Sequence, residues 1–251
     1  MVFFIMKISQ QQKTKNRRAI IRAAVELMTD KGVRAATMRE VARRAGLGDA
    51  TIYNYFPTKE SILFGYYEDH AKACIKELKA LDDFHTFTLQ EQLQTLFETS
   101  LALFLPDRGF VAASFGSVWL GGRRGWGRIK PVRDEFLKAI LDMIGAAEEV
   151  GEIPEQVFRE MIGQFYMDAY IAMVLYWLSD RSEKFGNTTQ IMDRGLDLAC
   201  ALLKAGIANK MFDLAIFLFK NHVLNRMGLF LNPLEDSGKV KRHFMETENN
   251  G

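Results

Sequence analysis

Residues 37–60 constrain what this chain can fold into more than any other segment. Thr37 and Glu40 stand three residues apart ahead of apolar residues at helical spacing, which is the pattern of a helix capping box. A glycine follows that run where the chain has to turn away. A second short helix is predicted over 49–55, and Pro57 prevents its continuation. Two short helices joined by a tight turn form a helix-turn-helix.

The second predicted helix has a polar outer face suited to DNA. Ile52 and Phe56 turn inward, which leaves hydroxyls, an amide and aromatic rims outside, where they can bond phosphates and base edges. These outward residues are Ala50, Thr51, Tyr53, Asn54 and Tyr55. Asn54 points directly away from Ile52, so we expect it to read a base by bidentate pairing with adenine.

Other residues of this segment are expected to position the chain on phosphates. They are Thr37, Thr51, Tyr53, Tyr55 and Lys59, together with Lys15, Arg17 and Arg18 at the basic start of an upstream helix. Residues 1–60 hold 12 Lys and Arg against 5 Asp and Glu, a balance of +7, whereas the rest of the chain carries −5. This regional split indicates a basic DNA-binding part and an acidic remainder with another task.

Residues 13–66 resemble the DNA-binding domain of the TetR family of bacterial transcriptional regulators. The resemblance rests on Leu27, Met28 and Gly32, on the run TMREVARRAG, and on TIYNYF followed by Pro57 and Lys59. It implies a cytoplasmic, homodimeric regulator, most often a repressor, whose second, helical domain binds a small molecule. It also implies a palindromic operator in double-stranded DNA, with recognition helices roughly 34–36 Å apart.

Asp49 departs from the usual pattern of that family, in which a non-acidic residue precedes the recognition helix. We expect its carboxylate to cap the helix or to favour the N-terminal dipole. The alternatives are that it accepts a hydrogen bond from a cytosine amino group or that it repels phosphate.

Length and periodicity predict an all-α chain. The 251 residues divide into a helix-turn-helix domain over 9–60, a second helical domain over 61–231, and a polar tail over 232–251. The resemblance implies that the second domain binds the effector and forms the dimer. A long helix is predicted from a Thr58 cap to about residue 80. Further helices are predicted over 88–105, 109–120, 131–150, 154–179, 188–206 and 209–230, with the GGRRGWG segment as a loop. We expect translation to start at Met1 or at Met6.

The helix over 154–179 is the most informative part of the second domain. It is apolar all round from Met161 to Leu178 apart from Asp168 and Gln164, so we expect burial on several sides rather than a membrane span. Asp168 either pairs with an arginine of another helix or anchors a cationic or hydroxylated ligand. Aromatic residues predict a hydrophobic or aromatic effector, although they would equally build a core. The predicted ligand-binding residues are Phe104, Phe115, Trp119, Phe165, Asp168 and Tyr176.

By the same resemblance, the last two long helices form a four-helix dimer interface. Small residues four apart permit close helix crossing, and the expected interface residues are Ala169, Ala172, Met192, Gly195, Leu196, Ala199 and Leu203. The 209–230 segment extends beyond the usual family layout. It is predicted to be an amphipathic helix that covers the core or widens the dimer contact, with a membrane-surface helix as the alternative.

The sequence offers poor support for an enzyme or a cofactor. The GGRRGWG segment lacks the Lys-Ser/Thr of a phosphate-binding loop; its arginines are expected in a solvated linker rather than on an anionic ligand. His70 and Cys74 lie four apart, but two ligands make no zinc site. Two alternatives to an effector-released repressor remain: a non-specific or architectural DNA binder without an effector, and a ligand carrier with an inactive DNA-binding head.

Overall fold

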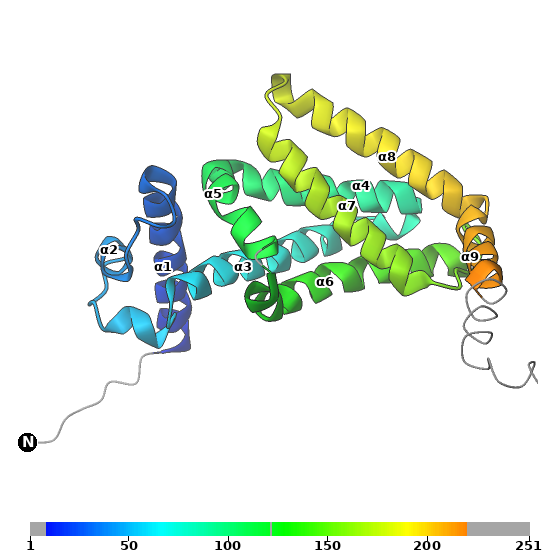
Figure 1. Ribbon diagram of the computed structural model, residues 1–251. Helices are drawn as coiled ribbons and strands as arrows, with labels where there is room; N and C mark the ends of the chain where they lie inside the picture. Colours follow the sequence, from blue (N-terminus) through cyan, green and yellow to red (C-terminus); the bar gives the residue numbers. More distant parts are fainter. Residues whose placement is uncertain (1–8, 121, 220–251) are drawn as a thin grey trace, which may run out of the picture.

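Side-chain caps fix the starts of the first four α-helices of this chain, which are labelled in Figure 1. The computed structural model describes residues 9–120 and 122–219, with the backbone alone over 122–126, and these residues contain helices and turns but no strand. Thr37, Thr58 and Thr88 each close a capping box, which satisfies amides that a helix start otherwise leaves unpaired. The predicted all-α class is thereby confirmed. The α-helices are α1 (Gln10–Lys31), α2 (Met38–Arg44), α3 (Lys59–Lys79), α4 (Leu89–Phe104), α5 (Arg108–Trp119), α6 (Gly122–Glu149), α7 (Arg159–Ser179), α8 (Gly186–Lys204) and α9 (Ile207–Leu218).

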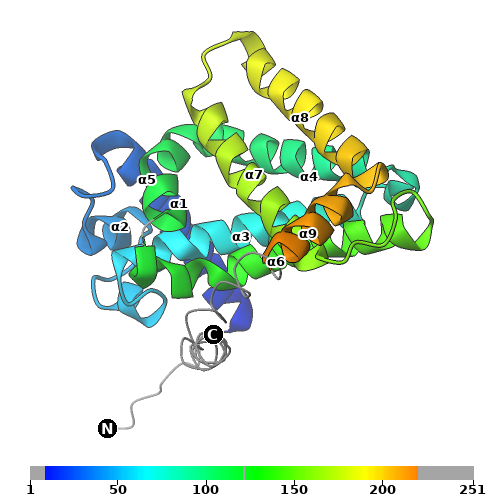
Figure 2. The same ribbon diagram turned by 45° about the vertical axis from the view of Figure 1, so that its right-hand side comes forward.

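Helix α3 joins the two ends of the molecule. Figures 1 and 2 show it running from the end that carries α1 and α2 into the body, where it packs between α4 and α6. Helices α1 and α5 also contact each other, so α1 touches the body beside α3 as well as through it. Helix α7 crosses the body over α5 and α6, and α8 returns along α4 to α9.

Aromatic rings fill the centre of the body. Tyr67, Phe115 and Trp119 contact one another, with centroids 5.4–6.2 Å apart, and Tyr170 stacks on Phe136 at 5.0 Å. All five are buried. Such contacts add to the stabilisation from burial, which is about 1.5–3 kcal/mol for each large apolar side chain.

A short chain of polar groups crosses this core. His70 Nε2 lies 2.8 Å from Ser100 Oγ, which lies 2.6 Å from the Tyr170 hydroxyl. The His70 ring also stacks on Phe104 at 3.5 Å. Burial lowers the pKa of His70 to about 3, so the ring is neutral near pH 7. Cys74, the other half of the considered zinc pair, donates to the Leu96 carbonyl instead. Among the described residues, no three His, Cys, Asp or Glu side chains cluster to hold a metal.

Several boundaries differ from those predicted. The second helix of the helix-turn-helix is a single 3₁₀ turn, η1 (Thr51–Asn54), rather than a helix over 49–55. The Thr51 and Tyr55 amides donate to the carbonyls three residues before them, and Pro57 has no amide with which to extend the helix. The GGRRGWG segment is not a loop: α6 begins at Gly122, where burial of Ile129 and Val132 outweighs the poor helix propensity of glycine. The predictions for residues 220–230 and for the 232–251 tail lie outside the described residues, as does the choice between Met1 and Met6.

One stretch of the described chain, Leu89–Trp119, is long and apolar enough to cross a membrane. It comprises α4, the turn Leu105–Asp107 and α5, and Phe97, Phe104 and Phe115 from it are fully buried in the aromatic core. Core helices of compact proteins pass the same test, so this stretch is weak evidence for a membrane span.

The buried His70 predicts a specific loss of stability in acid. The unfolded chain binds a proton near the ordinary pKa of 6.5, whereas the folded chain does so only near 3. The contribution of this group is therefore intact above pH 6.5 and is lost as the pH falls from 6.5 towards 3, at about 1.4 kcal/mol per pH unit. Urea unfolding should show wild type losing about 2 kcal/mol more than His70→Gln between neutral pH and about pH 5. The exposed His85 supplies the control His85→Gln; parallel pH profiles for wild type and His70→Gln would contradict this assignment.

Candidate DNA-binding surface and effector grooves

The first helix of the helix-turn-helix is fixed by its predicted capping box. The Glu40 amide donates to Thr37 Oγ1 at 3.3 Å, and the Thr37 amide donates to Glu40 Oε2 at 3.0 Å. The Lys31 ammonium, followed by the Thr37 hydroxyl and amide, lowers the pKa of Glu40 to about 2. The Thr37 side chain therefore serves the fold first, and its predicted role on phosphate would use an oxygen that already has partners.

The η1 turn exposes two side chains, those of Tyr53 and Asn54, that form no hydrogen bond within the described part of the chain. Ile52 is fully buried and Phe56 nearly so, which anchors the turn from below. Tyr53 is 51% exposed, and Asn54 is exposed with no hydrogen bond from its side chain among the described residues. Gly46, at φ +69°, allows the sharp approach to this turn. Ala50 is also exposed, and Thr51 is partly exposed.

Two predicted phosphate contacts are instead engaged within the protein. Asn16 Nδ2 donates to the Tyr55 hydroxyl at 2.9 Å, which holds α1 against the recognition turn. Lys59 Nζ donates to the carbonyls of Arg34 and Ala36 at 3.0 and 3.1 Å. Tyr55 and Lys59 therefore help to hold the helix-turn-helix together, and their predicted phosphate contacts stay a prediction.

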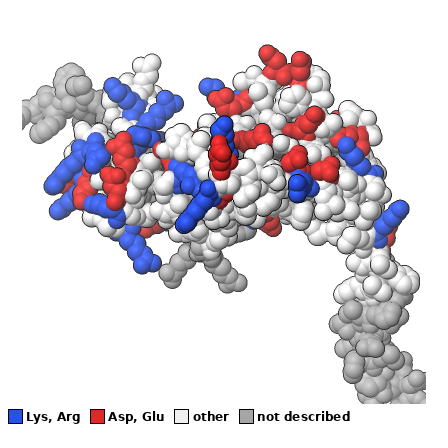
Figure 3. All heavy atoms as spheres, turned by 90° about the horizontal axis from the view of Figure 1, so that it is seen from above, with Lys and Arg blue, Asp and Glu red and all other residues white. Residues whose placement is uncertain are grey.

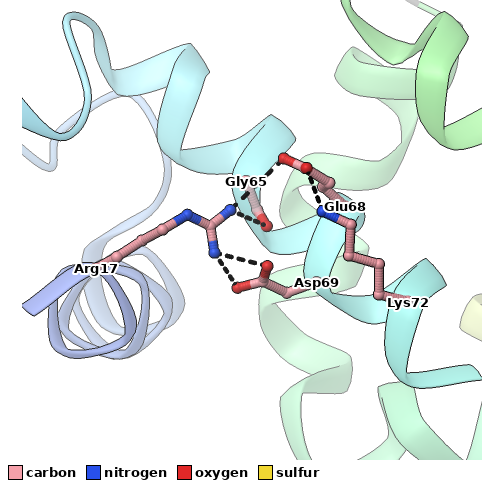
Figure 4. A network of polar contacts seen from close by, with 5 residues as sticks. All are labelled: Arg17, Gly65, Glu68, Asp69 and Lys72. Atoms are coloured by element: carbon pink, nitrogen blue, oxygen red, sulfur yellow. Dashed lines mark hydrogen bonds and ion pairs between the residues drawn. The ribbon is translucent and has the colours of Figure 1, made fainter. Parts of the chain in front are cut away.

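Arg17 likewise faces the body and not the DNA side (Figure 4). Its Nη1 donates to Asp69 Oδ1 at 2.6 Å, and its Nη2 lies 3.6 Å from Glu68 Oε2. The guanidinium also lies 5.6 Å from the centre of the Phe56 ring. A Cβ on Gly65 would stand 2.8 Å from a carbon of that ring. Because glycine has no side chain, α3 can lie this close to the Phe56 ring and to the Arg17 guanidinium. The expectation that Arg17 contacts phosphate is wrong for this conformation, in which it joins α1 to α3.

Asp49 does not cap the recognition turn. The turn has no side-chain cap, and Asp49 Oδ2 instead lies 3.7 Å from Arg39 Nε and 3.7 Å from Arg43 Nη2. Both arginines are more than 70% exposed. They are absent from the predicted set, although their spacing of four on the face opposite Val41 and Ala42 could have placed them outward.

Exposed cations gather at this end of the molecule (Figure 3). Lys15 and Arg18 are exposed and line a shallow hollow of about 400 Å³ on α1 with Gln10, Gln11 and Thr14. Arg39 and Arg43 on α2 add two exposed cations beside the recognition turn, and Arg18 also lines a hollow with Asp69 and Asp107 of the body. Such a surface can bind phosphates on either side of a DNA groove.

A groove of about 790 Å³ lies between the end of α5 and the faces of α6 and α7. Its apolar lining includes Trp119, Leu120, Ile171, Ala172 and Leu175, and its polar lining includes Lys130, Arg133, Asp134, Gln164 and Asp168. Asp168 Oδ1 lies 3.1 Å from Arg133 Nη2, so the ion-pair alternative describes its contact, while it also lines this groove. The Nε1–H of the buried Trp119 has no hydrogen-bond partner among the described residues.

The other predicted ligand residues lie elsewhere. Phe104 and Phe115 are fully buried in the aromatic core and line neither groove. Phe165 and Tyr176 line a second, apolar groove of about 390 Å³ between α7 and α8. Helix α7 is covered by α5, α6 and α8, as expected, but Phe165 is 61% exposed, so one apolar side of α7 stays open in a single copy of the chain.

The exposed apolar face of α7 continues on α8. Ile191, Gly195, Leu198 and Leu202 are exposed at alternating spacings of four and three, and Ala169, Ala172 and Ala199 are partly or fully exposed beside them. Met192, Leu196 and Leu203 are at most 4% exposed. These three belong to the inner side of the apolar stripe of α8, which packs on α4, although Met192 and Leu196 also line the groove between α7 and α8; their place in an interface stays a prediction.

Helix α9 follows α8 and is tied to the loop before α7. Asn209 Nδ2 donates to the Glu155 carbonyl at 2.8 Å, and the Val157 amide donates to Asn209 Oδ1 at 3.2 Å. The Phe158 and Phe212 rings lie 4.5 Å apart. Beyond this anchored first turn, Met211, Leu214 and Phe217 are more than half exposed.

Comparison with known proteins agrees with both ends of the chain. The family model described as "Bacterial regulatory proteins, tetR family" matches residues 20–65, and the one described as "Tetracyclin repressor-like, C-terminal domain" matches 92–218. The second match covers slightly more than half of the chain and includes α9. The expectation that the helix after α8 lies beyond the family layout is therefore wrong for its described part.

Relatives and solved structures extend this likeness. The fatty acid metabolism regulator protein of Bacillus subtilis is 23% identical over 168 residues, which is 67% of this chain and 86% of the relative. The crystal structure of the regulator FadR from Bacillus subtilis in complex with stearoyl-CoA is 20% identical, with a TM-score of 0.58, over 75% of this chain and 98% of that one. A TetR regulator from Nitrosomonas europaea gives 19% identity and a TM-score of 0.57 over 74% and 98%.

These proteins are transcriptional regulators rather than enzymes, and dimers are typical of their family. The family matches and the observed helix-turn-helix lead to one conclusion. The chain belongs to the TetR family of bacterial transcriptional regulators.

Proposed function

We propose that this chain is a cytoplasmic, homodimeric repressor that binds a palindromic operator and releases it when a hydrophobic effector binds. In this proposal, residues 9–60 bind DNA and 61–231 bind the effector and the second copy. The observation that carries it is the η1 turn, which is anchored by Ile52 and Phe56 and holds Asn54 outward and uncommitted. A side-chain amide held in this way can pair with an adenine edge in the major groove.

The exposed face of α7 and α8 supports the dimer. Phe165, Ile191, Leu198 and Leu202 are between 40% and 62% exposed, and an apolar face of this size is usually covered in solution. A twofold axis through that face would give two copies of the recognition turn. The palindrome follows from this symmetry, with half-sites about one DNA turn apart.

The 790 Å³ groove is the proposed effector site. Trp119, Ile171 and Leu175 offer an apolar wall. At its side, Lys130 and Arg133 form ion pairs with Asp134 and Asp168, which also line the groove, so a polar effector group would meet paired charges of both signs. This lining suits a molecule with a long apolar body and a polar group such as a carbonyl. One relative and one similar structure are named for fatty acid metabolism or degradation, and another similar structure is a complex with stearoyl-CoA. We therefore favour a fatty acyl thioester as the class of effector.

Release of the operator requires a difference in effector affinity between two states. An effector with equal affinity for the DNA-bound and released forms would shift nothing. The groove is formed by α5, α6 and α7, and α5 and α6 also pack against α1 and α3, respectively. An effector that separates these helices would therefore move α3, and with it the recognition turn.

Selection from sheared DNA of the source organism tests the proposed function. We expect the purified protein to retain a few fragments that share a palindrome. On that palindrome, Asn54→Ala should cost about 1–3 kcal/mol and relax base preference at one position, because the base contact is lost. Asn187→Ala, an exposed asparagine on α8, is the control and should bind as wild type does.

Uniform weak retention of all fragments would instead favour a non-specific or architectural DNA binder. No retention would favour a ligand carrier with an inactive head. If Asn54→Ala weakened operator and random DNA equally, Asn54 would not be a base reader.

The effector site is tested by two lysines on α6. Lys130 and Lys138 each form an exposed i,i+4 ion pair, with Asp134 and Asp142 respectively, but only Lys130 lines the groove. We expect long-chain acyl-CoA, but not coenzyme A alone, to release wild-type protein from its operator. Lys130→Gln should raise the acyl-CoA concentration needed by about fivefold, the loss of one exposed charge contact, and Lys138→Gln should not. Equal behaviour of the two variants would remove this groove as the site.

A further inference from the structure

The carboxylate of an aspartate beside the recognition turn forms ion pairs with two arginines of α2. Asp49 lies two residues before the η1 turn, and its Oδ2 lies 3.7 Å from both Arg39 Nε and Arg43 Nη2 on α2. Arg39 and Arg43 are one helical turn apart, so their guanidinium groups reach the same carboxylate from one side. The side chains are 76% and 72% exposed, and that of Asp49 is 42% exposed.

The function of this cluster is not explained by the fold. Asp49 makes no capping bond to the turn, and α2 is already fixed by its capping box and by the burial of Val41 and Ala42. Ion pairs this exposed contribute little to stability and weaken further in salt. Their effect is on where the arginines point.

DNA competes for the same arginines. Sequence-independent binding to DNA comes almost entirely from cations that neutralise phosphates and release counterions. A guanidinium held on Asp49 does not take part in that release. Among the described residues, Lys15 and Arg18 on α1 form no ion pair with a carboxylate, so they remain available to phosphates.

We infer that Asp49 withholds Arg39 and Arg43 from the DNA backbone, and thereby makes binding depend more on base contacts and less on phosphate contacts. This inference rests on the proposed DNA-binding function of the same face. It assigns to Asp49 a positioning role that acts through two arginines, in place of the cap or the base contact considered from the sequence.

The test compares Asp49→Asn with wild type on the operator and on a scrambled duplex over a range of salt concentrations. We expect the variant to bind the scrambled duplex about three- to tenfold more tightly at low salt. The slope of log affinity against log salt should become steeper by about 1–2, because each additional phosphate contact adds about 0.9. Asp142→Asn removes the same charge on α6, far from the recognition turn, and should change neither quantity.

A second background separates positioning from simple repulsion. In the variant Arg39→Gln/Arg43→Gln, adding Asp49→Asn should leave the affinity and the slope unchanged, because no arginines remain to be released. If the effect of Asp49→Asn persists there, Asp49 repels phosphate directly and the inference is wrong. It is also wrong if Asp49→Asn weakens operator binding, which would make Asp49 a base contact, or if the slope does not change. Failure of wild type to retain any duplex would instead overturn the proposed function.

Discussion

The contact between α1 and α3 at Arg17 is the interaction on which the account depends. Arg17 bonds Asp69 and the Gly65 carbonyl while lying near the Phe56 ring, and the absent side chain of Gly65 allows that approach. Each exposed ion pair alone contributes only about 0–1 kcal/mol. Together with the ring and the close helix approach, they make the start of α3 and the helix-turn-helix one packed unit. A displacement of α3 in the body can therefore reach the recognition turn without being absorbed at the junction.

The helices of the body pack closely against one another around a buried core. Its aromatic core is closed, and its polar groups His70, Ser100 and Tyr170 satisfy one another within it. Open spaces lie at the edges instead, among them the grooves between α5, α6 and α7 and between α7 and α8, and a hollow between α1 and α3. An effector in the first groove and a second copy over the α7 and α8 face would both contact α7. This shared helix offers a physical path by which the effector changes the spacing of two recognition turns.

The sequence predicted what local chemistry decides. The capping boxes at Thr37 and Thr58, the inward Ile52 and the outward Asn54 follow from residue type and spacing, and each lies as expected. Partners distant in sequence could not be predicted in the same way. The sequence indicates only DNA contacts for Arg17, Tyr55 and Lys59, because their partners within the protein come from distant segments. It indicates only an interface for Met192 and Leu196, because an apolar stripe does not reveal which neighbouring helix covers it.

The distance between the two DNA-binding heads of a dimer tests the central claim most directly. Because Cys74 and Cys200 are buried, a spin label on Glu60→Cys, at the exposed start of α3, would report that distance by double electron–electron resonance. We expect one narrow distance distribution in the operator complex and a different mean distance when the effector releases the DNA. An unchanged distance on release, or no measurable pair of labels, would contradict this claim.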